Sequence, residues 1–475
     1  MTTRAIGFDL GERDEDTSRG DVEALALIED AASVLFLQDP LRHECSQAYL
    51  ALLQQISLKA GPNKLFSAYG EFFRSLRRSG KASFADVVLD EIIAGRGNPV
   101  AEAVARTGAS ISSVAPVDLA AVAADLDLLQ RLCVSEATIL KWCERAAAAA
   151  SPSRRQPASW VAAASALGVR EEGADVGADG GADVGADGGA DVGAEGGADG
   201  DDALRFTRPA SVATIAATRN AVAESWKWSD ALEPHLTKHW RRHGLGEPSR
   251  GNVLTWHNPK RGATCDDVKH PDASSYGANG ANDDPDASSN AGIVNGVAWR
   301  TAPRAKDEPA HAALVSHFAA FANGDSEVGS SAGHHVLVHG PVGAGKRWLL
   351  MSSLGVCLGL QHDTSKGRPS KSPASALRVV RVPREALRQL PELCRFAGDH
   401  PRARFVFLLD MPLALAPHAE FYNELTCALD GGGGGRWPPN AILAAAALEP
   451  TALKPDAASS GGGGLACRFR LSVGV

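Results

Sequence analysis

Val336-Leu-Val-His-Gly340-Pro-Val-Gly-Ala-Gly-Lys346-Arg347 is the stretch of sequence that decides the fold class. A short apolar run precedes a glycine-rich loop, and a helix-like segment follows over residues 345–360. Glycines let the backbone curl so that several N–H groups point inward, and a helix N-terminus adds positive charge. A lysine at the end of such a loop reaches the β and γ phosphates of a nucleotide. The stretch therefore predicts a phosphate-binding loop between a strand and a helix. The alternative is a glycine-rich turn with a chance lysine.

The residues expected to contact the nucleotide are those of the loop and of the start of the helix. They are Gly340, Pro341, Val342, Gly343, Ala344, Gly345, Lys346 and Arg347. In such loops a Ser or Thr after the lysine usually supplies a hydroxyl ligand to Mg²⁺. Arg347 stands there instead, and a guanidinium group has no acceptor atom for a metal ion.

Strands and helices alternate around the loop. Besides Val336–Val338, the segments typical of strands are 377–382, 405–409 and 441–447, and those typical of helices are 384–399 and 417–430. This alternation predicts an α/β fold with a parallel sheet. We expect a P-loop nucleotide-binding domain of this class over residues 299–475.

Asp410 closes the apolar run that begins at Arg404. A carboxylate at the end of such a parallel strand lies beside the phosphate loop and can hold Mg²⁺ directly or through water. We therefore expect Asp410 to be the metal ligand. The next residue is Met411, which cannot polarise a water molecule. Together with Arg347, this favours weak or lost hydrolysis over a working enzyme that tolerates both changes.

Residues 21–150 have the apolar periodicity of an all-helical module. The repeating apolar residues are Leu65, Tyr69, Phe72 and Leu76, and later Leu119, Val122, Leu126, Leu129 and Cys133. Such stripes are typical of a buried core rather than of a ligand site. The second stripe follows Pro116, with Asp118 as the expected N-cap.

Low-complexity sequence separates these parts. We expect a disordered N-terminus over 1–20, an acidic linker over 151–204 and a loop over 262–298, with a helical segment and aromatic-rich connector over 205–261 between the last two. An eight-residue unit, Gly-Ala-Asp-Val-Gly-Ala-Asp-Gly, repeats from Gly173 to Gly196. Calcium-binding β-helix repeats have a period of nine, so a spacer is favoured over a calcium site.

Composition excludes several classes of protein. Residues 171–202 hold eleven acidic and no basic residues, and without them the formal net charge of -8 becomes +3. A strongly basic nucleic-acid binder is therefore not expected. The eight cysteines form no C-x-x-C pair, which argues against zinc ligation and a disulfide framework. No apolar run is long enough for a membrane span, and the acidic N-terminus resembles no signal or transit peptide. We expect a cytoplasmic protein, with an organelle left open.

His235, His239 and His243 lie four residues apart and could share one helix face, as metal ligands do. Lys238, Arg241 and Arg242 on the same segment would repel a cation. This favours a basic surface or interface helix over a metal site.

An ordered series of segments resembles the AAA-type ATP-binding family known as domain of unknown function 815. The segments that carry the resemblance are 239–246 with 253–256, the phosphate loop, 379–393, 404–410, 437–443 and, more weakly, 128–132. The resemblance covers residues 115–475 between the low-complexity inserts. It implies ATP or ADP as ligand, Mg²⁺ as its companion ion, a Walker B strand at 404–410 and a sensor strand after Asn440.

The chain departs from that family at three further places. The family closes its Walker B strand with an acidic pair, where this chain has Asp410-Met411. Its sensor strand ends near a polar Thr-Ser-Asn, where this chain has Ala446-Ala-Leu448. The family continues into a helical lid, which we expect this domain to lack. Arg468 stands where an arginine finger would fall. The expected function is ATP binding with weak or lost hydrolysis. The alternative is a non-catalytic scaffold whose helical module binds a protein partner.

Overall fold

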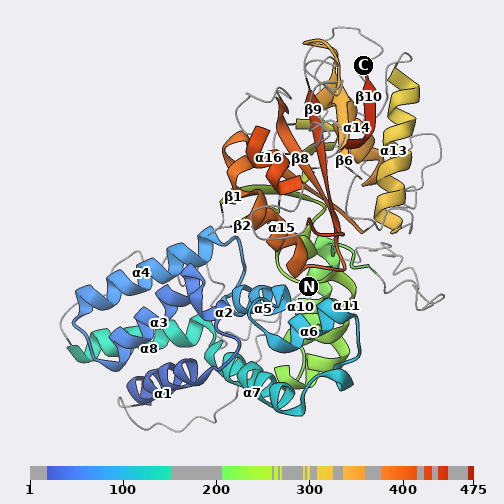
Figure 1. The fold of residues 1–475 in the computed structure, drawn as a ribbon. Coiled ribbons are helices and arrows are strands. Elements are labelled where there is room, and N and C mark those ends of the chain that lie inside the picture. The colour runs from blue at the N-terminus through green and yellow to red at the C-terminus, as the bar shows by residue number, and fades with distance from the viewer. Residues whose placement is uncertain are drawn as a thin grey trace, which may run out of the picture. The chain divides into compact units, whose positions relative to one another are not determined.

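A computed structural model describes most of the chain (Figure 1). The described residues are 19–150, 206–258, 262–265, 268–269, 292–294, 297–299, 307–324, 335–358, 376–413, 422–429, 437–447 and 469–475. The acidic linker, Leu448 and Arg468 lie outside them, as does most of the N-terminal segment.

Helices make up most of the first half of the chain. They are α1 (Arg19–Ser33), α2 (Asp39–Arg42), α3 (Glu44–Ser57), α4 (Pro62–Arg78), α5 (Phe84–Ala94), α6 (Pro99–Thr107), η1 (Ile111–Ser113), α7 (Pro116–Leu132), α8 (Glu136–Ala150), α10 (Val212–Ala223), η3 (Trp228–Ala231), η4 (Leu232–Thr237), α11 (Lys238–His243) and α12 (Glu247–Arg250). Later helices are α13 (Glu308–Asn323), α14 (Lys346–Cys357), η7 (Arg384–Gln389), α15 (Leu390–Asp399) and α16 (Tyr422–Leu429).

The strands among the described residues all lie in the second half of the chain. They are β1 (Val253–Asn258), β2 (Gly262–Cys265), β3 (Val268–Lys269), β4 (Gly292–Val294), β5 (Val297–Trp299), β6 (His335–His339), β7 (Leu377–Val382), β8 (Arg404–Leu413), β9 (Ala441–Ala447) and β10 (Phe469–Gly474).

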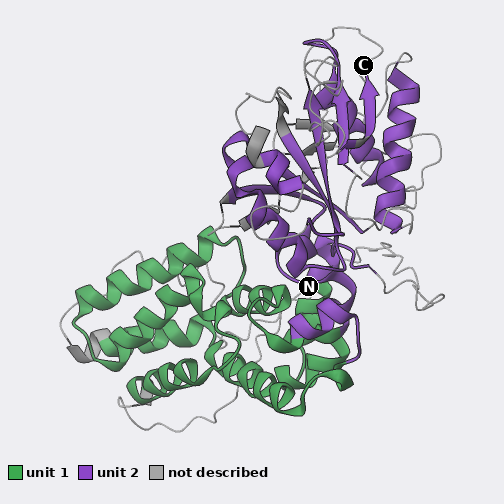
Figure 2. Ribbon diagram, viewed as in Figure 1, with its two compact units in different colours: residues 1–100, 111–204, 216–237 green, residues 101–110, 205–215, 238–475 purple. Residues whose placement is uncertain are grey.

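Two compact units are distinguished in Figure 2. The helical unit comprises Met1–Val100, Ile111–Leu204 and Ala216–Thr237, and the sheet unit comprises Ala101–Ser110, Arg205–Ile215 and Lys238–Val475. The helical region expected over 21–150 is confirmed as helical, although its first helix begins two residues earlier, at Arg19. Its residues 101–110 belong to the sheet unit.

The helical unit is built around buried aromatic rings. The ring of Tyr49 lies 5.3 Å from that of Phe72 and 4.3 Å from that of Phe84, between centroids. The hydroxyl of Tyr49 donates a 3.0 Å hydrogen bond to the carbonyl of Leu132. The first apolar stripe, from Leu65 to Leu76, is confirmed as core, because its residues are buried. The second is confirmed in its middle, at Val122, Leu126 and Leu129, whereas Leu119 and Cys133 at its ends are only partly buried.

The expected N-cap of α7 is wrong. The helix begins at Pro116, and its N-cap residue is Ala115, so Asp118 lies inside the first turn. Proline suits the first helical position because its fixed φ is helical and its missing N–H would have had no partner in the helix. An acidic residue in the first turn still interacts favourably with the helix dipole.

A seven-stranded sheet organises the sheet unit, in the order β10-β6-β9-β8-β7-β1-β2. The first six of these strands run parallel, and β2 pairs antiparallel with β1 at one edge. The predicted α/β fold with a parallel sheet is therefore confirmed. Residues 384–399, expected as one helix, form the 3₁₀ helix η7 followed by α15.

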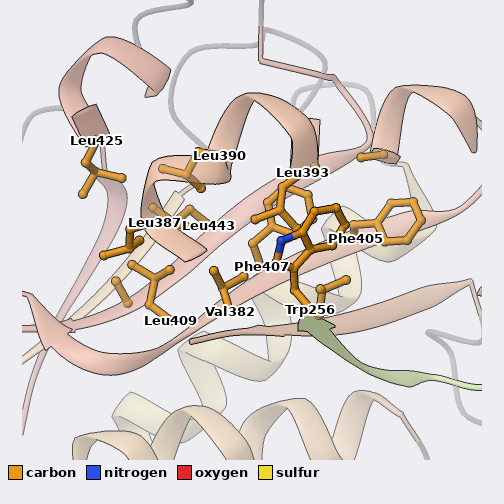
Figure 3. Packing of buried hydrophobic residues seen from close by; sticks show 14 of the residues in the cluster. Trp256, Val382, Leu387, Leu390, Leu393, Phe405, Phe407, Leu409, Leu425 and Leu443 are labelled. Carbon is orange, nitrogen blue, oxygen red and sulfur yellow. The ribbon is translucent and has the colours of Figure 1, made fainter. Parts of the chain in front are cut away.

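Helices cover both faces of this sheet (Figure 1). On one face, α13 and α14 pack against side chains such as Val338 and Val406. On the other, η7, α15 and α16 pack against Trp256, Phe405 and Phe407 (Figure 3). Strands buried on both faces are apolar along their whole length, which explains the near-continuous apolar run of β8.

The sheet starts earlier in the sequence than residue 299, where its domain was expected to begin. Val253 of β1 pairs with Val379 of β7, and β2 pairs with β1. The segment 262–298, expected as a loop, contains β2 and contributes to the three-stranded sheet β3-β4-β5. Short strands within sequence of low complexity give almost no periodic signal, so the pattern could not show them.

The helical segment expected within 205–261 is also interrupted. Residues 206–210 belong to no helix or strand, and their backbone is bonded elsewhere: the N–H groups of Thr207 and Ala210 donate to the carbonyls of Arg402 and Ser249. The fully buried side chain of Arg378 donates to the carbonyls of Thr207, Pro248 and Ala376. Burial lowers the pKa of Arg378 to about 9, and these hydrogen bonds compensate part of the cost of burying its charge.

Candidate functional site

The glycine-rich loop joins the end of β6 to the start of α14, as the sequence predicted. Gly343 has φ +78° and Gly345 has φ +89°, which is the left-handed region that other residues avoid. A Cβ atom built at either position would have no described atom within 4 Å. Their torsion angles, rather than lack of space, therefore require glycine. The space beside both residues is open to a ligand.

Lys346 is the first residue of α14, and its side chain turns back into the loop. It is 7% exposed. Its Nζ donates hydrogen bonds to the carbonyl oxygens of Gly340 at 2.8 Å and of Pro341 at 2.5 Å. Main-chain atoms of the loop therefore hold the ammonium group, a cation of the kind that donates strong hydrogen bonds to phosphate oxygens.

The start of α14 is electropositive. The Leu349 N–H donates to the Gly345 carbonyl at 2.9 Å, so the N–H groups before it lie at the open end of the helix. The first turn carries Lys346 and Arg347 and no acidic residue. The side chain of Arg347 is exposed. This end of the helix is suited to bind an anion.

The loop also lies at the place in the sheet where ligands bind in open α/β folds. From β6 the chain passes to β7, three strands away, and then returns through β8 and β9 to the neighbour of β6. The helix that follows β6 packs on one face, and those that follow β7 and β8 pack on the other. Ligands in such sheets bind outside the carboxyl ends of the strands where the order reverses.

Asp410 lies on β8, two strands from β6, but it does not end the strand as expected. The strand continues to Leu413. Pairing with β9 is irregular here, because Leu408 pairs with Ala444 and Pro412 with Ala446, so residues 409–411 face a single residue. Bulges of this kind bend the strand and re-aim side chains. The side chains of Asp410 and Met411 lie outside the described part of the structure.

The end of β9 lies between β8 and β6, where a sensor strand was expected. Ala446 pairs with Val338 and Ala447 with His339, and both alanines are buried. A methyl group offers no hydrogen bond, so these two positions supply no polar sensor. Leu448 is the third residue at which the family has a polar side chain, and it lies outside the described residues.

The described residues fit a phosphate group better than a metal ion. The side chain of Arg347 has no oxygen atom. The nearest hydroxyl groups along α14 already form hydrogen bonds within the protein. Ser352 Oγ lies 3.1 Å from His311 Nε2, and Ser353 Oγ donates to the Leu349 carbonyl. In the part of the chain that the structure describes, no group of three or more His, Cys, Asp or Glu could hold a metal ion.

The sequence favoured a basic surface or interface helix, but the three histidines do not lie together on one exposed helix. His235 lies on η4, while His239 and His243 lie on α11, with ring centroids 4.8 Å apart. His239 is buried, and burial together with nearby His243 lowers its pKa to about 3. His243 Nδ1 lies 2.8 Å from the carbonyl of Arg208 and bonds to it. His239 and His243 therefore pack against each other within the sheet unit, beside the backbone of Arg208.

Sequence reasoning missed β10, which forms the sheet edge beside the loop. The register places Gly474 opposite His339, at the start of the phosphate loop. Apolar residues alternate over Phe469, Leu471, Val473 and Val475, and that period-two pattern could have revealed the strand. Arg468, the candidate arginine finger, precedes β10 and lies outside the described residues.

No protein-family model, no curated protein and no solved structure matches this chain. The resemblance to the AAA-type family therefore stays an expectation drawn from the motifs. Among the described helices, none is long and apolar enough to cross a membrane.

Proposed function

We propose that this chain binds ATP or ADP through residues 340–347 and belongs to the AAA-type P-loop class. The observation that carries the proposal is Lys346, a buried cation whose Nζ is held by the carbonyls of Gly340 and Pro341 in a loop with two left-handed glycines. The open helix N-terminus, the position at the sheet reversal and the open space beside Gly343 and Gly345 support it.

Hydrolysis is weak or lost in this proposal. Arg347 supplies no oxygen ligand, and Ala446 and Ala447 offer no polar group at the end of β9. Met411 stands where an acid would orient water. Asp410 would hold Mg²⁺, which would supply charge stabilisation for the phosphates when bound. Binding is better supported by the described residues than turnover.

Calorimetric titration with ATP and ADP, each with and without Mg²⁺, tests the proposal. Lys346→Ala should weaken binding at least about tenfold, because a charge-assisted contact to phosphate contributes roughly 1.5–3 kcal/mol. The matched control is Lys238→Ala, which removes an exposed lysine on α11 of the same unit. Wild-type protein that binds neither nucleotide would refute the proposal.

A second candidate is a scaffold whose helical unit binds a protein partner. Exposed apolar side chains on α1 favour it, since Val22 is 62% and Leu25 50% exposed. Single exposed apolar residues are common, so the test must be specific. Cross-linking of a partner that Leu25→Glu abolishes, with nucleotide binding absent in wild type, would establish the scaffold instead.

A further inference from the structure

The end of β10 contacts the start of the phosphate loop through main-chain atoms. The strand runs parallel to β6, and the Val475 N–H donates a 3.0 Å hydrogen bond to the carbonyl of His339. That carbonyl belongs to the residue immediately before Gly340. The side chain of Val475 is partly buried against the core formed with α13 and α14.

Gly340 has a positive φ of +157°, as the other two loop glycines have positive φ, and in addition a steric reason to be glycine that those two lack. It is buried, and a Cβ atom built on it would lie 2.6 Å from the carbonyl oxygen of Val475 and 3.6 Å from the Val475 nitrogen. A real Cβ essentially never approaches a backbone oxygen so closely. At Gly343 and Gly345, by contrast, the space is open. The first glycine therefore admits the β10 backbone.

The same glycine also holds the lysine, because the Gly340 carbonyl accepts the 2.8 Å hydrogen bond from Lys346 Nζ. Contacts thus run continuously from Val475 to Gly340 and on to Lys346. Gly340 is in contact with Val475 on one side and with Lys346 on the other, so the orientation of its peptide groups depends on both residues. A shift of β10 would move the acceptor that places the ammonium group.

We propose that Val475 is a positioning residue of the phosphate loop. This inference rests on the proposed nucleotide binding at residues 340–347. The main chain of Val475 fixes the position of Gly340. Packing of β10 against β6 and phosphate binding by the loop therefore stabilise each other. Such coupling is reciprocal: a ligand in the loop must protect β10 by as much as docked β10 favours the ligand.

Two substitutions at Val475 separate the main chain from the side chain. Val475→Pro removes the N–H donor to His339, while Val475→Ala keeps it and trims only the side chain. In calorimetric titration of the full chain, Val475→Pro should weaken ATP binding about fivefold, the effect of one typical hydrogen bond. Val475→Ala should weaken binding less than Val475→Pro does. Gly340→Ala should weaken binding at least about tenfold.

Hydrogen exchange supplies a readout that needs no bound nucleotide. In the nucleotide-free protein, amides of residues 340–345 should exchange faster in Val475→Pro than in Val475→Ala. In wild type, added ADP should increase protection of residues 471–475, and this arm holds even if the proline variant does not fold. Wild-type affinity in Val475→Pro, or unchanged protection of β10 with ADP bound, would overturn the inference. Absence of nucleotide binding by wild type would instead overturn the proposed function, while loop exchange in the free protein still tests the positioning role.

Discussion

Lys346 Nζ donates a 2.8 Å hydrogen bond to the carbonyl oxygen of Gly340, six residues earlier in the chain. The lysine that is expected to meet phosphate is therefore already bonded to its own loop. In the proposed nucleotide complex, a phosphate oxygen would be a further hydrogen-bond acceptor for the same ammonium group. The shape of the cation matters here as much as its charge.

Lys346→Arg should keep the positive charge and still weaken ATP binding about tenfold. The guanidinium group is planar and larger than an ammonium group, and its donors form a fixed fork that does not match two adjacent loop carbonyls. Titration calorimetry beside Lys346→Ala measures the effect. Affinity equal to wild type would show that charge alone suffices at this position.

Gly345→Ala should lower the free energy of unfolding by roughly 1–2 kcal/mol, because alanine at φ +89° is strained even without a clash. Gly398→Ala is the matched control, since Gly398 lies within α15, where no described atom approaches its Cβ position and φ is ordinary. That substitution should stabilise by about 0.5–1 kcal/mol. Urea unfolding of both variants gives the comparison, and equal effects would contradict the torsional argument.

Asp125→Asn should lower the free energy of unfolding by about 3 kcal/mol. The buried carboxylate accepts hydrogen bonds from the N–H groups of Leu35, Phe36 and Leu37, at 2.9, 2.6 and 3.0 Å. An amide keeps one acceptor oxygen and loses the charge. Asp118→Asn, in the first turn of the same helix, should change stability by less than about 0.5 kcal/mol. Similar losses in both variants, by urea unfolding, would count against this role of Asp125.

His239 should make the protein less stable in acid. Burial, and then nearby His243, lowers its pKa from 6.5 to about 3. The folded state then binds fewer protons than the unfolded state, so the free energy of unfolding falls as pH drops from 6.5 toward 3. The slope is at most about 1.4 kcal/mol per pH unit.

His239→Gln should flatten that slope without abolishing it, because burial also lowers the pKa of His311 and of His339. Denaturant unfolding at a series of pH values measures the slope in each protein. A wild-type stability independent of pH across this window would show that His239 accepts a proton freely when folded.

Turnover should lie at background in wild type while nucleotide binding persists. Arg347→Thr and Met411→Glu should do little singly, because catalytic groups that act as a unit are not additive. Together they restore a hydroxyl ligand and an acid, and phosphate release should then rise above background. The controls are Asp410→Ala introduced into the wild type and into the double variant. Robust wild-type release that disappears in Asp410→Ala would show a working ATPase despite its altered motifs.

Local patterns in the sequence determined the glycine-rich loop and most of its flanking elements. Torsion preference is a property of each residue, so Gly343 and Gly345 identified the curled backbone before Lys346. Periodicity is equally local, and strand β7 has the predicted bounds Leu377–Val382. Helical stripes such as Leu65 to Leu76 predicted the buried face of α4 for the same reason.

Contacts between distant segments were decided only by the tertiary structure. Sequence showed an aspartate at 125 and an arginine at 378, but not the remote main-chain groups that each one bonds. In the sequence, Gly340 could not be distinguished from the other loop glycines. The structure shows the main chain of Val475 packed against it. Strand order and register depend on packing both sheet faces at once, and no single segment carries that information. The conformation of the loop could therefore be predicted from its own residues, whereas its contact with β10 and Val475 could be seen only in the tertiary structure.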